Sequence, residues 1–234
     1  MDDVSGEYYF LEMNTRLQVE HPVTEATHLG LDIVELMIAQ GIAQRESPLG
    51  GLEYSLFDRS KFAEVHNLHA IEARIYCENP SAGFKPTPGI LQYVHFPSGS
   101  DYEWLRIDTW VETGTTVTPY FDPLIAKVIV HAAAREEAIQ RLDSVLREIR
   151  VCGPPNNLPY LQEIVRSEIW IAGSATTTFL DTFQFVPRWV ISLITPARSV
   201  LTNNCMQGDR RVEWGYRDVY TGLARTKAWL GHAS

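Results

Sequence analysis

The chain is poor in cysteine and lacks a hydrophobic run as long as a membrane span. Its three cysteines, Cys77, Cys152 and Cys205, are an odd number without metal-like spacing, which favours a reduced compartment. No stretch approaches the roughly 20 apolar residues that cross a bilayer, and no basic, apolar leader opens the sequence. We therefore expect a cytoplasmic protein without a membrane partner, although these features also allow a mitochondrial one.

The sequence also lacks an excess of basic residues. It has 20 Lys and Arg against 29 Asp and Glu, a formal net charge of −9, which argues against a nucleic-acid partner because phosphate contacts need a basic face. The charge is uneven: residues 188–234 carry seven basic and three acidic side chains, so this tail is positive. The shift predicts a boundary near Pro187 and a poorly packed tail over residues 188–234.

The 234 residues suffice for one or two domains with a real core. Residues 7–13 are rich in aromatic side chains and predict a buried strand. Because one strand cannot form a sheet, we expect its partners to come from elsewhere and the chain to begin within a domain. Thr24 is expected to cap a helix that runs to about Gln40 and ends at Gly41.

A block of β pattern follows the loop-like residues 44–68, and helices follow that block. Gly and Pro residues interrupt the pattern and separate five expected strands, at 70–76, 90–96, 105–111, 116–119 and 124–130. Apolar residues at helical spacing predict helices over 135–150, 157–167 and 176–183. Strands in a block followed by helices indicate an α+β fold.

The segment from Glu12 to Glu20 carries the most chemistry. On a strand, alternate residues share a face, so five polar side chains would align there: Glu12, Asn14, Arg16, Gln18 and Glu20. Such a row cannot be buried without partners. It is either an edge face that meets only water or a site that binds its own ligands, and the ordered set that leads into Glu-His-Pro-Val-Thr favours a site.

The residue types suggest three roles. Glu12 and Asn14 offer hard oxygen ligands suited to Mg²⁺ or Mn²⁺. Arg16 offers a planar fork for a small oxyanion, and Gln18 with the backbone at Val19 can hold a neutral oxygen. Glu20 stands beyond the metal ligands, where it could accept a proton.

Three blocks of this sequence resemble biotin carboxylase, an ATP-grasp enzyme. They are residues 10–24, residues 69–80 with 86–89, and residues 119–127, and the likeness covers about Val4 to Val186. The resemblance implies three parts: the end of an ATP-grasp domain over 1–42, the biotin carboxylase C-terminal domain over 43–187, and a divergent tail over 188–234.

The resemblance also implies a ligand for each polar residue of the segment. Glu12 and Asn14 would bind the metal that bridges the ATP phosphates. Arg16, Gln18 and Val19 would hold bicarbonate. The ATP-grasp lid and a second metal-binding glutamate of the family would precede this segment, so the chain on its own is expected to be inactive.

Two further roles follow from the resemblance. Glu20 would be the base that deprotonates bicarbonate for attack on the γ-phosphate. Arg74 would stabilise the enolate oxygen of biotin, which a separate biotinylated carrier domain would bring to the site. The plain alternative for Arg74 is a strand arginine paired with Glu72 or Glu78.

Other residues are weaker candidates. Asp122 and Lys127 are expected to be structural, tying together the strands around Pro123. His21 is expected to be a packed turn residue, because Pro22 restricts it. By resemblance only, residues 153–154 and 156–157 approach the adenine end of the nucleotide.

The subfamily rests on fewer residues. Residues 105–111, 114–127 and 179–187 look most like urea carboxylase. Two alternatives stay open: a component of an acyl-CoA or pyruvate carboxylase, and a non-catalytic module that keeps the fold for dimerisation, since this domain forms dimers in the family. A module that had lost catalysis would be expected to lose Arg16 or Glu20, and both are present.

Overall fold

The computed structural model describes residues 5–10, 12–28, 30–46, 68–98 and 102–186, together with the backbones of two short strands. These strands, β10 (Asn204–Gln207) and β11 (Arg210–Glu213), form an antiparallel pair. The expected loop at 44–68 lies largely outside the described residues, and its first residues, 44–46, are helical. The expected tail, 188–234, also lies outside them apart from that pair.

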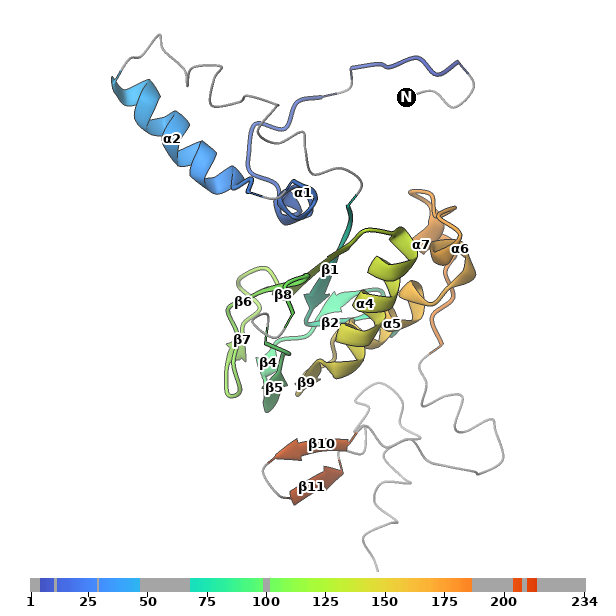
Figure 1. Ribbon diagram of the computed structural model, residues 1–234. Helices are drawn as coiled ribbons and strands as arrows, with labels where there is room; N and C mark the ends of the chain where they lie inside the picture. Colours follow the sequence, from blue (N-terminus) through green and yellow to red (C-terminus); the bar gives the residue numbers. More distant parts are fainter. Residues whose placement is uncertain are drawn as a thin grey trace, which may run out of the picture.

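The centre of the fold is a three-stranded antiparallel sheet in the order β1-β8-β6 (Figure 1). Its strands are β1 (His69–Tyr76), β6 (Leu105–Thr109) and β8 (Leu124–Ala132). The strands expected at 70–76, 105–111 and 124–130 are therefore confirmed, with small differences at their ends. Because β8 lies between the other two, β1 has one edge that pairs with no strand of the described residues, and we call this its free edge.

Three short strand pairs form separate two-stranded sheets. They are β2 (Glu78–Asn79) with β3 (Lys85–Pro86), β4 (Gly89–Ile90) with β7 (Thr116–Val117), and β5 (Tyr93–His95) with β9 (Arg150–Cys152). The strand expected at 90–96 is thus two strands, and β2, β3, β9 and the 3₁₀ turn η2 (Pro80–Ala82) were not expected.

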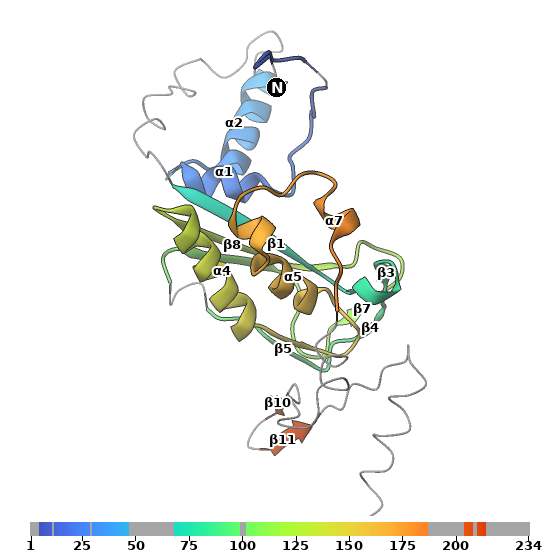
Figure 2. The same ribbon diagram turned by 90° about the vertical axis from the view of Figure 1, so that its right-hand side faces the viewer.

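Helices cover one face of the sheet (Figure 2). They are α4 (Arg135–Glu148), α5 (Leu158–Val165), α6 (Glu168–Ile171) and α7 (Phe179–Thr182). The α+β class is confirmed. The helix expected over 135–150 ends early, because Ile149 turns to an extended conformation before β9, and the helix expected over 176–183 shortens to α7. None of the described helices is long and apolar enough to cross a membrane.

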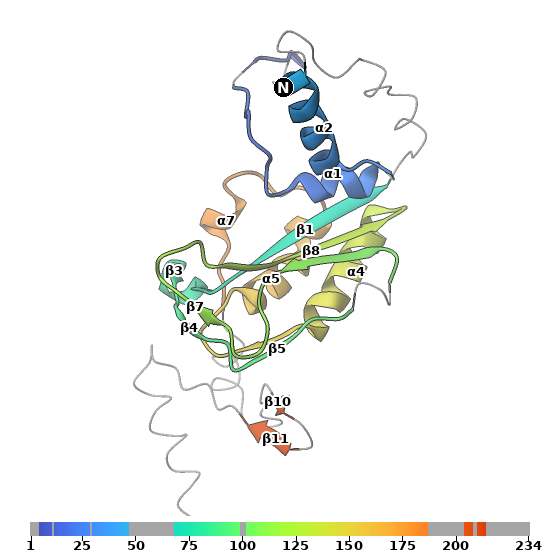
Figure 3. The ribbon, with the colours of Figure 1, turned by 90° about the vertical axis from the view of Figure 1, so that its left-hand side faces the viewer.

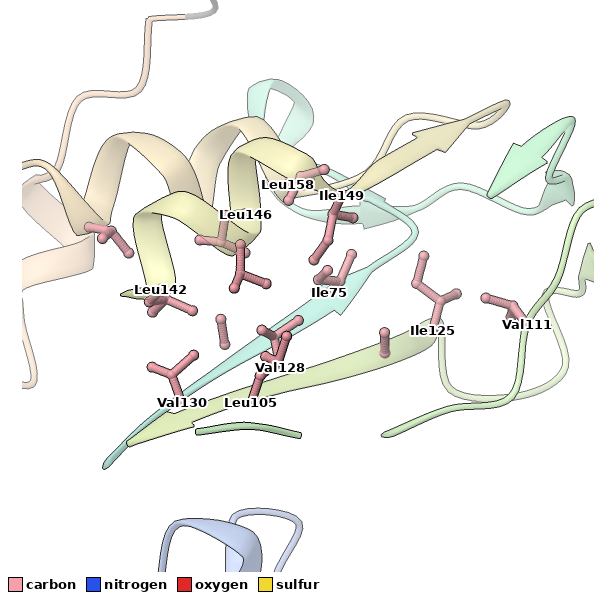
Figure 4. Close-up of a cluster of buried hydrophobic side chains, with 14 of the residues drawn as sticks. Ile75, Leu105, Val111, Ile125, Val128, Val130, Leu142, Leu146, Ile149 and Leu158 are labelled. Atoms are coloured by element: carbon pink, nitrogen blue, oxygen red, sulfur yellow. The ribbon is translucent and has the colours of Figure 1, made fainter. Parts of the chain in front are cut away.

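The core lies between the sheet and α4 (Figure 4). Ile75 and Val128 of the strands and Leu142, Leu146 and Ile149 at the helix are at most 1% exposed. Fully burying an aliphatic side chain of this kind contributes about 1.5–3 kcal/mol. The core therefore fixes the strands that carry the polar residues of the opposite face.

The expected single helix near the N-terminus is two helices. They are α1 (His21–Thr27) and α2 (Ile33–Glu46), with Gly30 between them at φ +86°. Helix α1 begins before Thr24 because Pro22 is tolerated in a first turn, where its missing N–H costs nothing. Gly41 lies inside α2 and does not end it, so both predicted ends were wrong.

The strand expected at residues 7–13 is also wrong for the residues described there. Residues 5–10 and 12–13 form no strand, and Tyr8, Phe10 and Met13 are 83%, 80% and 75% exposed. Within the part of the chain that the structure describes, no strand lies beside them to complete a hydrogen-bonded ladder. The chain then bends at Arg16 and turns at Val19–Glu20 into α1.

Helix α1 lies against β1 and β8 on the face opposite to α4 (Figure 3). The sheet is therefore covered on both sides, by the core helices on one and by α1 on the other. Pro22 of α1 and Ile129 of β8 are both buried there. This contact brings the segment that ends at Glu20 to the polar face of β1.

Candidate active site

The polar face of the sheet follows from strand alternation. In the register of the three strands, Arg74 of β1 lies opposite Lys127 of β8, which lies opposite Asp108 of β6. Successive side chains of a strand point to opposite faces, so these three share the face that α1 covers. Their neighbours Ala73 and Val128 point into the core.

The carboxylate of Glu20 and the guanidinium of Arg74 meet on this face. The Nη2 atom of Arg74 donates to Oε2 of Glu20 at 2.8 Å. Glu20 stands at the N-cap of α1, although its side chain caps no backbone N–H there. The structure thus brings together two of the expected catalytic residues, one from the first block of the resemblance and one from the second.

The environment of Glu20 favours the ionised carboxylate. Its pKa is lowered, first by a hydrogen bond from its own backbone and then by the charges of Arg74 and Arg16, while burial opposes this in part. Arg16 therefore lies close enough to Glu20 to act on its charge. The two cations and the carboxylate form one electrostatic group.

A second carboxylate holds Arg74 from its own strand. The Nε atom of Arg74 donates to Oε1 of Glu72 at 2.9 Å, and the side chain of Glu72 is 5% exposed. Burial acts to lower the pKa of Arg74, but the hydrogen bonds and charges of Glu72 and Tyr76 outweigh it and raise that pKa. The plain alternative, a pair with Glu72, is therefore present alongside the pair with Glu20.

Asn157, directly before α5, holds the backbone of β1 at its free edge. Its Oδ1 accepts from the N–H of Tyr76 at 2.9 Å, and its Nδ2 donates to the carbonyl of Arg74 at 3.1 Å and to Oε1 of Glu78 at 3.2 Å. The side-chain amide thus replaces a neighbouring strand at this point. Asn157, expected near the adenine by resemblance, supports Arg74 in this structure.

Further ion pairs fasten the segment and α1 to the sheet. Lys127 donates to the carbonyl of Val19 at 3.0 Å and pairs with Asp108 at 3.2 Å. Arg106 pairs with Glu25 of α1 at 2.7 Å and with Asp108 at 2.8 Å. Sequence reasoning missed Arg106, Asp108 and Glu25. The alternating positions of Arg106 and Asp108 on β6 were an available signal, whereas Glu25 lies on α1.

A cavity of about 510 Å³ opens beside the Glu20–Arg74 pair. Its walls come from α1, from the free-edge strand β1 and from Arg135 and Trp170. Arg135 donates to the carbonyls of Trp170 and Ile171, which fixes this wall. The cavity gives a small anion access to both members of the pair.

The expected metal ligands lie together at the surface. Nδ2 of Asn14 is 3.5 Å from Oε1 of Glu12, and both side chains are exposed. The described residues hold no group of three or more His, Cys, Asp or Glu that could bind a metal. Two adjacent hard oxygens fit Mg²⁺ only as part of a shell that phosphates and other groups complete, which is how Mg²⁺ commonly binds at phosphates.

The expected alternation of the five polar residues does not hold. The bend at Arg16 and the turn at Val19–Glu20 interrupt any strand geometry. The Gln18 carbonyl instead accepts from the backbone N–H of His21 at 3.2 Å. The contact of Glu20 with Arg74 arises from the packing of α1 on β1 and not from a shared strand face.

The weaker candidates have structural contacts. Oδ1 of Asp122 accepts from the N–H of Leu124 at 2.8 Å, and His21 contacts the Gln18 carbonyl at 3.0 Å. Both contacts are local and fit the predicted structural roles, whereas Lys127 ties Val19 to the sheet and not the strands around Pro123. Gly153 packs tightly on the backbone of Ile90.

Family models match two parts of the chain. Residues 72–182 match the biotin carboxylase C-terminal domain, and residues 1–47 match the ATP binding domain of the carbamoyl-phosphate synthase L chain. The chain belongs to the biotin carboxylase family. The resemblance that the three sequence blocks predicted is confirmed.

Two similar proteins indicate which kind of biotin carboxylase this chain resembles. A putative urea carboxylase of Emericella nidulans is 46% identical over 185 residues, covering 79% of this chain and 14% of that protein. The crystal structure of Kluyveromyces lactis urea carboxylase is 45% identical, with a TM-score of 0.64, covering 76% of this chain and 14% of that one. The chain therefore spans a small part of these relatives.

A second similar structure was solved with small molecules bound. The biotin carboxylase domain dimer of Hydrogenobacter thermophilus 2-oxoglutarate carboxylase, in complex with MgADP, ADP and bicarbonate, is 33% identical with a TM-score of 0.64. The match covers 84% of this chain and 38% of that chain. The identity is lower than to the urea carboxylases.

Proposed function

We propose that this chain supplies the bicarbonate-activating side of a biotin carboxylase active site within a urea carboxylase. The observation that carries the proposal is the contact of Glu20 with Arg74 beside a cavity, with Arg16 close enough to lower the pKa of Glu20. A small anion held by two cations next to a carboxylate suits proton abstraction from bicarbonate.

In this proposal each residue has one task. Arg16 holds the bicarbonate oxygens, with Gln18 and the Val19 backbone beside them, while Glu20 accepts the bicarbonate proton. The freed oxygen would attack the γ-phosphate of ATP and displace ADP, and the carboxyphosphate so formed would break to CO₂ and phosphate. Arg74 stabilises negative charge on the ureido oxygen of biotin, whose N1 proton passes to that phosphate.

Glu12 and Asn14 are proposed to ligate a divalent cation. When bound, Mg²⁺ or Mn²⁺ would neutralise charge on the ATP phosphates. The ATP-gripping region, the biotinylated carrier domain and a second copy of the domain are proposed partners. The chain alone lacks catalytic groups that act as a unit in the family, so we expect no biotin-dependent ATP hydrolysis above background from it.

A chimera tests the proposal. Residues 5–186 of this chain would replace the matching segment of Kluyveromyces lactis urea carboxylase, and bicarbonate-dependent ATP hydrolysis would be measured. We expect the chimera to keep activity and the Arg16→Ala chimera to lose about 100-fold or more, because removing one oxyanion-binding donor costs 10²–10³ in rate.

The same chimera separates the alternatives. If it folds and assembles like its parent but hydrolyses no ATP, the chain is a non-catalytic module. An acyl-CoA or pyruvate carboxylase shares this half-reaction, so the acceptor is tested separately by asking whether the complete protein consumes urea.

A further inference from the structure

One side-chain oxygen of Glu72 has no hydrogen-bond donor in the part of the chain that the structure describes. The side chain of Glu72 is 5% exposed, and Oε1 accepts from Nε of Arg74. Within the described residues, however, the buried Oε2 accepts no hydrogen bond. Burying a carboxylate oxygen without a hydrogen-bond donor costs free energy of folding. Its position beside Arg74 therefore indicates a functional role.

Arg74 divides one edge of its guanidinium between two carboxylates. Nε and Nη2 form that edge, and its spacing matches the two oxygens of a single carboxylate. Here Nε binds Glu72 at 2.9 Å, while Nη2 binds Glu20 at 2.8 Å. Glu72 thus holds half of a bidentate pair, and its unpartnered oxygen is the place of the other half.

In the proposed function, Glu20 is a stronger base once it loses this contact. A carboxylate that accepts a hydrogen bond from a guanidinium is a weak base, since the cation favours its ionised form. Glu20 can accept the bicarbonate proton more readily once Nη2 of Arg74 has left it. The guanidinium then needs another acceptor close by, or it is left less well paired.

We propose that Glu72 is a positioning residue that receives Nη2 of Arg74 when Glu20 acts as the base. The exchange replaces one hydrogen bond, Nη2 to Oε2 of Glu20, by another, Nη2 to Oε2 of Glu72, and it transfers no proton. It turns the outer edge of the guanidinium toward the biotin oxygen. This inference rests on the proposed role of Glu20.

The residues around Arg74 leave room for its side chain to move and hold its backbone in place. Glu20, Glu72 and Arg74 all line the 510 Å³ cavity, so the guanidinium has room to turn. The backbone of Arg74 is fixed from the other side, because Asn157 binds its carbonyl at 3.1 Å and the N–H of Tyr76 at 2.9 Å. Glu72 lies on the same strand and stays at a constant distance.

Nuclear magnetic resonance of the full 234-residue chain, labelled with ¹⁵N-arginine, tests the exchange. The Arg74→Lys variant assigns the Arg74 guanidinium signals by their loss. In Glu20→Gln, where the charged partner of Nη2 is gone, we expect Nη2 to pair with Glu72. Rotation about the Cζ–Nη2 bond should then be about tenfold slower than in free arginine, because bidentate pairs are strong and geometrically fixed.

The double variant Glu20→Gln with Glu72→Gln should restore fast rotation. Glu148→Gln is the matched control: it removes the same charge from an exposed residue of α4, on the other side of the sheet, and should change nothing. Fast rotation in Glu20→Gln alone overturns the inference and indicates that a water satisfies Oε2. Because no turnover is measured, this result is independent of the chimera.

Discussion

The guanidinium of Arg74 lies 2.8 Å from the carboxylate of Glu20, although 54 residues separate the two in the sequence. The pair joins the first turn of α1 to the free-edge strand of the sheet. Its side chains are 36% and 51% exposed. A contact this accessible to solvent is poorly placed to stabilise the fold and well placed to meet a substrate.

The first prediction separates stability from function at this pair. Glu20→Gln should leave the free energy of unfolding nearly unchanged, because exposed ion pairs contribute little. Leu146→Ala, which truncates a core side chain that is 0% exposed, should cost about 2–5 kcal/mol. Urea unfolding of both variants gives the comparison. A loss for Glu20→Gln as large as that for Leu146→Ala would make the pair structural.

The second prediction concerns the amide that replaces a strand. Asn157→Ala should destabilise the fold by about 2–3 kcal/mol, because it leaves buried groups of β1 without partners. Asn156→Ala is the matched control. Its side chain donates to the Val151 carbonyl at 3.3 Å and accepts from the Leu158 N–H at 3.1 Å, so its cost should be about 1 kcal/mol.

Unfolding in urea, followed by circular dichroism, measures both asparagine variants. Asn157→Ala should also disturb the Arg74 guanidinium signals, whereas Asn156→Ala should not. Equal losses in the two variants would show that the amide at position 157 has no special part in holding β1.

Strands in the sequence were predictable where one face is buried and the partner strand is in the chain. For β1, β6 and β8 the apolar residues alternate or run continuously and are flanked by Gly and Pro, so their positions were confirmed. The segment at residues 7–13 has the same local pattern but no partner among the described strands. Local pattern cannot supply the missing hydrogen bonds.

The sequence predicted the polar residues of the candidate site but not the contacts that hold them in place. Glu20 and Arg74 were found by resemblance, and the structure places them in contact. Asn157 was expected near the nucleotide, and its bonds to β1 were missed. These bonds join residues that are 81 positions apart in the sequence, and no local pattern indicates such a contact. The break of the N-terminal helix at Gly30 was missed for a related reason: one glycine inside a periodic segment is ambiguous.

The third prediction compares two glycines with positive φ. Gly153 has φ +139°, and a Cβ there would lie 2.4 Å from the carbonyl oxygen of Ile90. Gly114 has φ +95° but nothing within 4 Å of such a Cβ. Gly114→Ala should therefore cost only the backbone strain, about 1 kcal/mol.

Gly153→Ala adds a clash with the backbone of the neighbouring strand, which a side-chain rotation cannot relieve. We expect it to cost at least about 3 kcal/mol. Thermal unfolding of the two variants tests this difference. Similar melting temperatures would mean that the β9 edge moves freely away from Ile90.

The fourth prediction is a pH dependence that originates at Cys77. This thiol is buried, and burial raises its pKa from the ordinary value of 9.0 to about 11. The unfolded chain therefore loses the thiol proton at a lower pH than the folded chain does. Below about pH 9 the thiol is neutral in both states, and its contribution to stability is fully present.

As the pH rises from 9 toward 11, the ionised unfolded chain becomes favoured and the contribution of Cys77 is lost. The loss should approach roughly 2 kcal/mol, since each pKa unit corresponds to about 1.4 kcal/mol. Other groups titrate in this range, so the measurement is the difference between the wild type and Cys77→Ala. Stability that falls equally steeply in both proteins between these pH values would show that the thiol of Cys77 reaches water in the folded state.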